Sequence, residues 1–521
     1  MHIKLLIAFP FCIGALALGF ASGQDAAEFA SGVVFHDVDR DGILGEKEPR
    51  LAGVGVSNGR KVVQTDESGR WRLPAEEADE FFVIKPSGWM VPVDENNLPQ
   101  FFYIHRPKGS PDSRIPGIPP TGPLPEAINF PLLPQDEPEA FDVLLFGDTQ
   151  PRNQQEVDWI AEDVVDGLVG WGGAFGVTLG DVVFDNLGLF KPLSEVIGEI
   201  GVPWFQVVGN HDVNREANDQ HANETFIRHF GPATYSLDWG PAHFVVLDNV
   251  FWSQKGGKPT YEARLRPDIL DFVRNDLALV PREKLVVFLM HIPLGGVAEK
   301  KEFFELFEDR PATLSVSAHR HVQEHFFFGR KDGWGGEKPH HHLVNVTVCG
   351  SWWSGALDED QIPHATMSDG APNGWTELHV EKDSYRISFH AARSEPSHQI
   401  NLTIKPSESG SVGDLYANVF NGSEATTVEF RLNRQGAWQA MDKTREEDPH
   451  YLELVAGEQE ARGRALSPRT RKLPKAQKSS HLWKVSLPLG TLGPGRHIVE
   501  VRANSSYGFP ASAEKSFVVK P

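Results

Sequence analysis

The pattern of apolar and polar positions changes along the chain, and its central part alternates between two periods. From Phe141 onwards, apolar runs of four to six residues alternate with stretches of helical periodicity at 156–171, 189–200 and 267–280. In the last stretch four apolar residues recur on one helical face: Ile269, Val273, Leu277 and Val280. Strands that alternate with helices are typical of an α/β domain with a largely buried sheet. We predict such a domain over residues 139–397.

On both sides of this domain the pattern is that of short strands. Residues 24–115 alternate short apolar segments with Gly, Asn and Asp turns, and residues 398–521 do so with Gly, Pro, Asn and Ser turns. We therefore predict two all-β sandwich domains, the second of them immunoglobulin-like. Residues 116–138 are rich in proline, and we expect an extended linker there rather than a packed element.

The first 23 residues have the pattern of a secretory signal peptide. Lys4 supplies positive charge, residues 5–20 are apolar, and residues 21–23 form a small-residue cleavage site. An uncleaved anchor is the alternative, but the run of about 16 residues contains Pro10, whereas a membrane span needs roughly 20. No later stretch of the sequence is apolar for long enough to be a transmembrane segment. We predict export to the periplasm or the medium.

Charge and cysteine content narrow the function classes. The formal net charge is −21, which disfavours binding to nucleic-acid phosphates. The two cysteines are Cys12 and Cys349, and Cys12 lies in the predicted signal peptide, so the mature chain can form no intramolecular disulfide. A large exported chain of this kind has to depend on core burial, with bound metals as a further aid.

Five predicted strands of the central domain each end in side chains that can bind a metal. They are followed by Gly147-Asp148-Thr149-Gln150, Gly180-Asp181, Gly209-Asn210-His211-Asp212, His291-Ile292-Pro293 and Ala318-His319-Arg320-His321. Because strand C-termini line the ligand crevice of an open α/β sheet, we expect these ends to converge. Each segment alone is more simply a helix cap, a turn or an ordinary histidine. Together they indicate a metal centre, and oxygen and imidazole donors without thiolate favour Mn, Fe or Zn.

This ordered set resembles the calcineurin-like metallophosphoesterases, with their Asp-x-His, Gly-Asp, Gly-Asn-His-Asp/Glu, lone His and Gly-His-x-His motifs. The resemblance covers residues 141–395 and implies a four-layer α-β-β-α sandwich with two divalent or trivalent transition-metal ions. It places one metal on Asp148, Gln150, Asp181 and His321. It places the other on Asp181, Asn210, His291 and His319. The family's catalytic histidine falls on His211, with Asp212 beside it.

The chemistry of these residue types suits the implied roles. The two oxygens of Asp181 can bridge two cations, which lower the pKa of a shared water so that a bridging hydroxide can attack phosphorus. The metals offset charge in the transition state, and His211 can donate a proton to the leaving oxygen. We predict an exported metallophosphoesterase that hydrolyses a phosphomonoester or phosphodiester, with a small molecule, a lipid or a cell-envelope component as substrate.

Three positions depart from the family pattern. Gln150 replaces the usual His, Ala318 replaces the usual Gly, and "GDVVFDN" lacks the Asp-Arg-Gly ending of protein phosphatases. The last departure argues against a Ser/Thr protein phosphatase. Gln150 is a neutral, poorer donor, so its metal should be the more easily lost. It also keeps an alternative open, a non-catalytic surface or glycan-binding protein with a degenerate phosphoesterase domain, against which the intact Asp181 and His211 argue.

Two further segments, 230–249 and 348–375, resemble exported bacterial members with a β domain on each side. Trp352 and Trp353 follow a predicted strand, where they either wall the substrate cleft or anchor the loop as core aromatics. The run His340-His341-His342 is internal, and we expect it to form a solvated loop rather than a further metal site.

A second candidate metal site lies in the N-terminal domain. Residues 37–48 fit the twelve-residue calcium pattern, with glycine at position 6 and acids at positions 1, 3, 5 and 12: Asp37, Asp39, Asp41 and Glu48. The flanks have the pattern of strands rather than of the two helices of an EF-hand. With the sequence that follows, the loop resembles the calcium-binding β repeats of bacterial surface proteins. We predict a structural Ca²⁺ site, with an acidic turn as the alternative.

Overall fold

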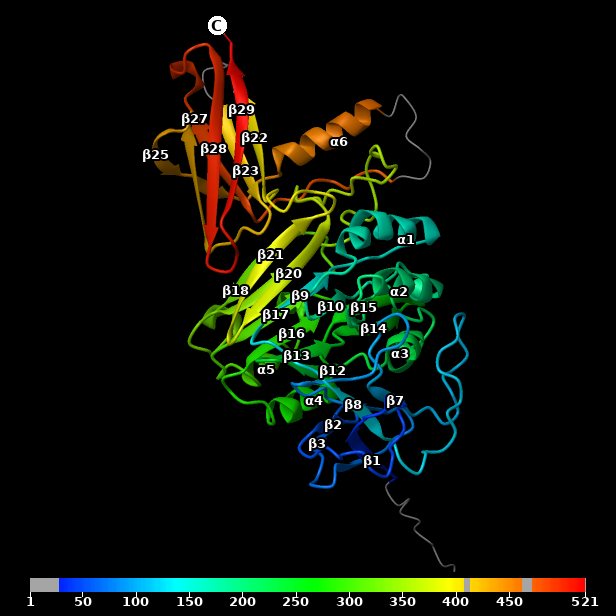
Figure 1. Cartoon of the computed structure of the whole chain (residues 1–521). Coiled ribbons are helices and arrows are strands. Elements are labelled where there is room, and N and C mark those ends of the chain that lie inside the picture. Colours follow the sequence, from blue (N-terminus) through cyan, green and yellow to red (C-terminus); the bar gives the residue numbers. More distant parts are fainter. Residues whose placement is uncertain (1–27, 407–412, 462–470, 521) are drawn as a thin grey trace, which may run out of the picture.

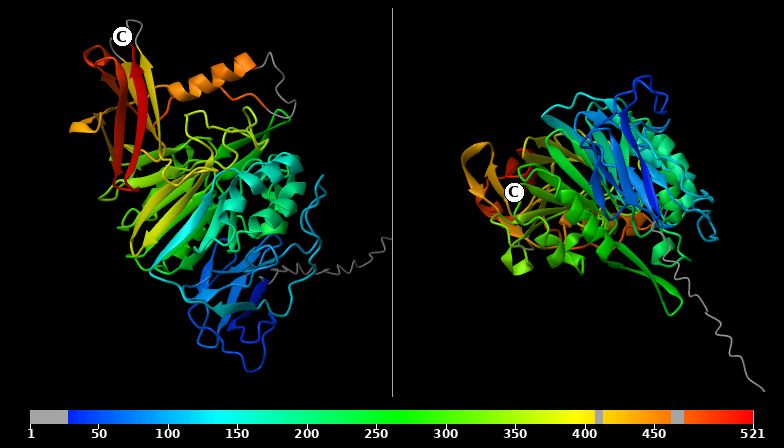
Figure 2. Two further views of the ribbon diagram at one scale, coloured as in Figure 1. Left: turned by 45° about the horizontal axis from the view of Figure 1, so that its top comes forward. Right: turned by 90° about the horizontal axis from the view of Figure 1, so that it is seen from below.

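Three regions follow one another along the chain, with the N-terminal and C-terminal β regions at opposite ends of the central one (Figures 1 and 2). The computed structural model describes residues 28–406, 413–461 and 471–520. The predicted signal peptide, residues 1–23, lies outside the described residues. Within the described ranges, no helix is both long and apolar enough to cross a membrane.

Two four-stranded sheets form the N-terminal region, with strand orders β4-β1-β8-β6 and β3-β2-β5-β7. In β4, exposed and buried residues alternate, so that Trp71 and Leu73 enter the core. The strands of the region are β1 Phe29–His36, β2 Gly55–Ser57, β3 Val62–Gln64, β4 Arg70–Pro74, β5 Glu80–Val83, β6 Trp89–Met90, β7 Phe102–Ile104 and β8 Phe130–Pro134.

The proline-rich segment is more than the extended linker that its composition predicted. Strand β8 lies within residues 116–138 and pairs in parallel with β1 and antiparallel with β6. Phe130 and Leu132 are buried in the core, whereas Pro131 and Pro134 lie outside it. The prediction of a linker was wrong here because Phe130 and Leu132, two positions apart on the strand, give the segment a buried face despite its proline content.

Two mixed sheets form the central region, with orders β11-β10-β9-β20-β21 and β12-β13-β16-β17-β19-β18. Strands β9, β10 and β11 are mutually parallel, as are β13, β16, β17 and β19. The five-stranded sheet contains β9 Ala140–Phe146, β10 Phe175–Leu179, β11 Trp204–Val207, β20 Gly374–Glu381 and β21 Ser384–Ala391. The six-stranded sheet contains β12 Tyr235–Trp239, β13 Ala242–Leu247, β16 Leu285–Met290, β17 Thr313–Ser317, β18 Glu324–Phe328 and β19 His340–Val344. A separate hairpin consists of β14 Val250–Lys255 and β15 Lys258–Ala263.

The two central sheets share a hydrophobic core. Val143 and Leu145 of β9 belong to the same buried cluster as Val287 of β16. Their neighbours Leu144 and Phe146 point to the opposite face and belong to a second cluster, which contains residues of α1 and α2. The five-stranded sheet therefore packs on the other sheet with one face and on helices with the other (Figure 1).

Helices form in all three stretches that have helical periodicity. The first, α1, begins where the Asn153 side chain accepts a hydrogen bond from the Glu156 amide, and it continues through a π turn, Ala161–Val165. Proline occupies the first turn of α4, where its missing N–H costs nothing. The central helices are α1 Gln154–Ile160, α2 Phe190–Gly198, α3 Glu224–Phe230, α4 Pro267–Leu277 and α5 Lys300–Glu305.

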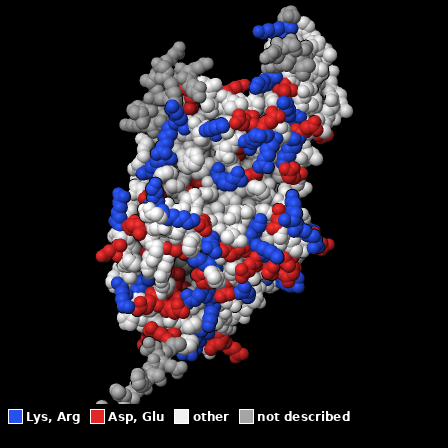
Figure 3. Space-filling model, turned by 180° about the vertical axis from the view of Figure 1, so that it is seen from behind, with Lys and Arg blue, Asp and Glu red and all other residues white. Residues whose placement is uncertain are grey.

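The C-terminal region has its own core between two antiparallel sheets, β22-β23-β27-β26 and β25-β24-β28-β29. Helix α6, Pro449–Ala461, lies beside them. The strands are β22 Ile400–Pro406, β23 Gly413–Val419, β24 Thr426–Leu432, β25 Gln435–Ala440, β26 Asp442–Thr444, β27 Leu482–Leu487, β28 Gly495–Ser505 and β29 Ala511–Val519. On the face of the molecule in Figure 3, basic and acidic side chains are interspersed.

The histidine run is a buried strand, not the solvated loop that we predicted. His340, His341 and His342 begin β19 and are each at most 1% exposed. Ser315 of the neighbouring strand β17 hydrogen-bonds both His340 Nε2 and His342 Nδ1, at 2.8 and 2.7 Å. Tyr385 hydrogen-bonds His341 Nδ1 at 2.8 Å. Burial is tolerated because these hydroxyl groups satisfy the imidazole nitrogens.

Candidate metal centre

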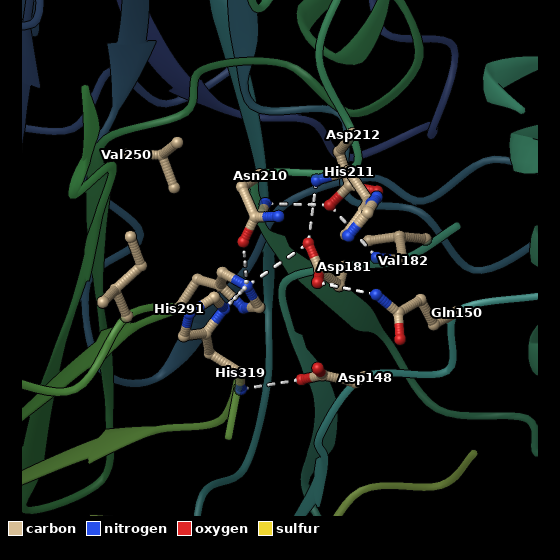
Figure 4. Close-up of polar contacts among 12 residues, drawn as sticks. Asp148, Gln150, Asp181, Val182, Asn210, His211, Asp212, Val250, His291 and His319 are labelled. Atoms are coloured by element: carbon tan, nitrogen blue, oxygen red, sulfur yellow. Dashed lines mark hydrogen bonds and ion pairs between the residues drawn. The ribbon is translucent and has the colours of Figure 1, made fainter. Parts of the chain in front are cut away.

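The ends of five strands converge at the site, as the sequence predicted, but they come from both central sheets (Figure 4). Asp148, Asp181 and Asn210 follow β9, β10 and β11 of the five-stranded sheet. His291 and His319 follow β16 and β17 of the six-stranded sheet. The site therefore lies where the C-terminal edges of the two sheets meet. Ligands of a single open α/β sheet likewise bind outside the carboxyl ends of its strands.

One group of donors contains Asp181, Asn210, His291 and His319. His291 Nε2 lies 3.2 Å from both Asp181 Oδ1 and Asn210 Oδ1. His319 Nδ1 lies 3.1 Å from the same His291 nitrogen. Ligand atoms of Asp181, His291 and His319 lie within 4.8 Å of one another. Two imidazole nitrogens that face each other beside two oxygens form a donor set that suits a cation between them.

The second group contains Asp148, His321 and Gln150. His321 Nε2 lies 3.0 Å from Asp148 Oδ2, and its Nδ1 is hydrogen-bonded to the Gly350 carbonyl oxygen at 2.6 Å. A backbone carbonyl on one ring nitrogen orients the other towards a metal position. Gln150 lies beside this pair, but its amide nitrogen donates to Asp181 Oδ2 at 2.8 Å, so its oxygen points away from Asp181.

The backbone holds these residues in an uncommon conformation. Positive φ angles occur at five of the seven predicted ligands: Asp148, Gln150, Asp181, His319 and His321. A non-glycine residue in this region costs of order 1–3 kcal/mol, and such strain gathers at functional sites. The strand ends therefore turn sharply at the point where each side chain has to enter the site.

Two glycines and one alanine allow the strand ends to come close. A Cβ on Gly180 would lie 2.6 Å from His291 Nδ1, and one on Gly209 would lie 2.0 Å from the Asp181 backbone nitrogen. Ala318 replaces the family's glycine, and its φ is negative, unlike that of His319 beside it. Its methyl group therefore fits without backbone strain.

His211 lies at the edge of the site. Its backbone N–H donates to Asp181 Oδ1 at 2.9 Å, and its Nδ1 is hydrogen-bonded to Asp185 Oδ1 at 2.8 Å. Its ring stacks on Phe184 with 4.3 Å between the ring centres. Although burial lowers the pKa of His211, the hydrogen bond that its ring donates to the Asp185 carboxylate raises the pKa above its ordinary value. The partly exposed imidazole is thus held through Nδ1, which leaves Nε2 for a substrate.

Sequence reasoning missed Asp185. It lies in "GDVVFDN", the segment that we compared only with the protein-phosphatase ending. Its second oxygen pairs with Arg215, which fixes the carboxylate that orients His211. A signal was present, since the acid stands four residues after the predicted bridging Asp181 on the same loop.

Asp212 is bonded to backbone amides, unlike its neighbour His211, which lies at the edge of the site. Its carboxylate accepts three backbone N–H groups, from Val182, Val183 and Gly209, at 2.8 to 3.0 Å. The side chain is fully buried. The motif residue therefore ties the loop after β10 to the loop after β11.

The two tryptophans play separate parts. Trp353 is 1% exposed, and its indole N–H donates to the Thr149 carbonyl oxygen at 3.2 Å, which anchors the loop. Trp352 is half-buried and lies on the His321 ring, with 4.0 Å between ring centres. Tyr261, on the β14–β15 hairpin, meets the His319 ring edge-on at 5.7 Å. Sequence analysis did not single out this tyrosine, because nothing in the hairpin pattern links it to a site.

The predicted calcium ligands form a separate group in the N-terminal region. Ligand atoms of Asp37, Asp39 and Glu48 lie within 4.8 Å of one another, whereas Asp41 lies outside this group.

Comparisons with known proteins agree with the motifs. The model for the N terminal of calcineurin-like phosphoesterase matches residues 39–115, and the model for its C terminal matches residues 342–509. No curated protein matches the chain. Among solved structures, a purple acid phosphatase from yellow lupin (Lupinus luteus) seeds is 14% identical and covers 71% of this chain and 67% of its own, with a TM-score of 0.34. A glycosyl hydrolase family 2 member from Bacteroides cellulosilyticus is 7% identical and covers 93% of this chain and 73% of its own, with a TM-score of 0.18.

Along the sequence, the two family models match on either side of the segment 148–321 that carries the donor groups. The chain thus matches the models for both terminal parts of calcineurin-like phosphoesterase, and these matches support a phosphate-ester hydrolase.

Proposed function

We propose that the protein is an exported phosphoesterase that uses two metal ions to hydrolyse a phosphomonoester or phosphodiester. The observation that carries the proposal is the convergence of two donor groups around Asp148 and Asp181, with His211 at their edge. A group of buried carboxylates and facing imidazoles is costly unless a cation completes it. Export rests on the apolar start of the sequence alone.

The residues present fit a binuclear centre of Mn, Fe or Zn. Asp181, Asn210, His291 and His319 would hold one ion, and Asp148, Asp181, His321 and the Gln150 oxygen would hold the other. The Gln150 amide has to exchange its oxygen and nitrogen to take part, because its nitrogen now faces Asp181. When bound, the ions would acidify a water and offset the charge that develops on the phosphate.

The chain's own residues supply the proton and the positioning. His211 carries a proton on Nε2 towards the leaving oxygen, while Asp185 holds Nδ1 and Phe184 packs against the ring face. Arg215 keeps the Asp185 carboxylate in place. Trp352 lies over His321, where its half-exposed ring covers one side of the site.

The finer architecture is also part of the proposal. We infer a four-layer α-β-β-α catalytic domain over residues 139–397, with β-sandwich domains over 24–115 and 398–521. The shared core of the two central sheets, and the helices on the outer face of the five-stranded sheet, support this division. The separate core of the C-terminal region supports the last boundary.

Metal content and hydrolysis measured on the same preparations test the proposal. The substrates are p-nitrophenyl phosphate and bis(p-nitrophenyl) phosphate, with and without Mn²⁺. We expect His211→Ala to keep the wild-type metal content, measured by plasma mass spectrometry, and to lower hydrolysis by about 10²- to 10⁴-fold. His229→Ala, on the exposed side of α3, is the matched control and leaves both unchanged.

Two results together would overturn the proposal. The protein would bind no transition metal, and His211→Ala would hydrolyse both substrates as the wild type does. The alternative, a surface or glycan-binding protein with a degenerate phosphoesterase domain, would then stand.

A further inference from the structure

The loop of residues 37–48 gathers three carboxylates without a positive partner. Ligand atoms of Asp37, Asp39 and Glu48 lie within 4.8 Å of one another. Among the described residues, no Lys, Arg or His side chain forms an ion pair with any of the three. Like charges at this separation repel each other, so the arrangement is unfavourable unless a cation lies among them.

Asp37 provides a second, independent observation. Its side chain is 3% exposed. Its Oδ2 accepts a hydrogen bond from the Gly42 amide at 3.0 Å, but its Oδ1 is buried and has no hydrogen-bond partner among the described residues. A buried carboxylate oxygen without a donor is costly. The orphan oxygen belongs to a carboxylate of the acidic group, where a bound cation would satisfy it.

Backbone hydrogen bonds hold the loop in the shape that brings the acids together. Glu48 Oε1 accepts from the Val38 amide and Oε2 from the Gly45 amide, both at 2.8 Å, which closes the end of the loop on its beginning. The Asp41 carboxylate instead accepts from the Ile43 amide at 2.7 Å. The loop is therefore ordered in advance, so a cation would pay little ordering entropy on binding.

The sheet fixes both ends of the loop. Strand β1 ends at His36, whose amide donates to the Pro49 carbonyl oxygen at 2.8 Å. Phe35 and Arg50 form an antiparallel bridge across the same gap. Gly42, at the sixth position of the loop, has φ +74, which allows the sharp turn between the acids.

We propose that residues 37–48 bind one Ca²⁺ through carboxylate oxygens of Asp37, Asp39 and Glu48. All three donors are hard oxygens, without imidazole or thiolate, which selects against Zn and the other transition metals of the phosphoesterase centre. Ca²⁺ accepts six to eight oxygens in an adaptable geometry, whereas Mg²⁺ demands a near-ideal octahedron. The site is therefore separate in place and in metal from the phosphoesterase centre, and its role is to stabilise the N-terminal region.

Calorimetry on the full chain, loaded with transition metal, tests this site with CaCl₂ as the titrant. We expect one Ca²⁺ per chain with Kd of about 10⁻⁴ to 10⁻³ M, the range of extracellular modules. At ten times Kd, the melting temperature should rise by roughly 3 °C. Asp37→Asn should weaken Ca²⁺ binding at least tenfold without lowering the melting temperature in the absence of Ca²⁺, because it removes the orphan charge.

Glu46→Gln is the matched control, since Glu46 is an exposed acid of the same loop outside the group. It should bind Ca²⁺ as the wild type does. No heat of binding and no melting shift up to 10 mM Ca²⁺ would overturn the proposal, as would equal loss of binding in the two variants. Hydrolysis of p-nitrophenyl phosphate should not change on Asp37→Asn, so this result is independent of the proposed function.

Discussion

The central region contains two groups of buried histidines that differ in what faces them. His291, His319 and His321 end strands and face the carboxylates of Asp148 and Asp181. The histidines of the second group, which we call the hydroxyl-bonded cluster, lie within β18 and β19 and face hydroxyls and one another: His325, His340, His341 and His342. The protein itself completes the histidines of the second group, whereas we propose that a cation completes those of the first.

The pKa values of the histidines also differ between the two groups. Although burial lowers it, the Asp181 carboxylate raises the pKa of His291 to about 9. Burial lowers the pKa of His340 to about 3, because no carboxylate opposes the desolvation. His319 is the exception in the first group, since burial and the neighbouring His291 lower its pKa to about 4. A histidine binds a metal only as the neutral imidazole, so His291 has to lose its proton when a cation enters.

Removal of one histidine from each group should have opposite consequences. His291→Ala should lose transition metal and lower kcat/KM by about 10³-fold or more, because the metals supply several kcal/mol of transition-state stabilisation. His340→Ala should keep its metal and its activity for as long as it remains folded. Plasma mass spectrometry and initial rates measure both. Equal metal content in the two variants would contradict the comparison.

Asp185→Asn tests the residue that sequence analysis missed. The amide still bonds His211 but no longer stabilises its charged form, so kcat should fall by about 10²-fold with little change in KM or in bound metal. The alkaline limb of the rate profile should also move to lower pH, because the general acid His211 has to be protonated and Asp185 raises its pKa. An unchanged pH profile with an unchanged kcat would show that the contact at 2.8 Å has no catalytic part.

Ser315→Ala tests whether the hydroxyl-bonded cluster is structural. Its hydroxyl bonds both His340 and His342, so two buried nitrogens would lose their partner. We expect a loss of about 2 kcal/mol in the free energy of unfolding, measured by urea denaturation, without loss of metal. Ser384→Ala, at an exposed position of β21, is the control. Loss of metal from Ser315→Ala would show that the cluster belongs to the site.

The pH dependence of stability should come from the second group. Burial lowers the folded-state pKa of His340 to about 3 and of His325 to about 4, whereas unfolded histidine titrates near 6.5. The unfolded chain therefore binds more protons between these values, and stability falls as the pH falls from about 6.5 towards 4. Each such histidine contributes about 1.4 kcal/mol per pH unit.

The measurement uses metal-free protein, so that release of metal in acid does not contribute. Urea denaturation at several pH values gives the slope, and His340→Leu should make it shallower. His243 provides an internal contrast, because Asp276 and Asp238 raise its pKa to about 9 despite burial, so its contribution is lost only as the pH rises from about 6.5 through 9. A slope that His340→Leu leaves unchanged would contradict the assignment.

The sequence predicted what depends on short, ordered patterns. The five strand ends, the family and the helices near 156–171, 189–200 and 267–280 follow from periodicity and motif order, and the structure and the comparisons agree with them. The burial of the histidine run could not be predicted in this way, because it depends on hydroxyls of β17 and on Tyr385, which no local pattern links to the run. The prediction of a linker at β8 was wrong for the same reason, since the pairing of this strand with β1 is a long-range contact.

The orientation of Gln150 was equally beyond the sequence. The amide in place of a histidine was visible, but whether its oxygen or its nitrogen faces the site depends on the tertiary position of Asp181. The nitrogen donates to Asp181 Oδ2 at 2.8 Å, and the oxygen lies 3.8 Å from Cys349 Sγ. Residue type therefore predicted a weak ligand, and in the observed geometry the amide would have to turn over before its oxygen could bind a metal.

Gln150→His should produce the smallest effect and is the sharpest test of the first group. An imidazole needs no exchange of its ends and is a better donor than a neutral amide, so the ion on Asp148 and His321 should be held about tenfold more tightly. Competition with a chelator, read as the amount of metal retained per chain, measures this, with Gln154→His on the exposed start of α1 as the control. If Gln150→His retains no more metal than the wild type, Gln150 lies outside the metal shell. The ion that it was predicted to weaken is then held by Asp148, Asp181 and His321 alone.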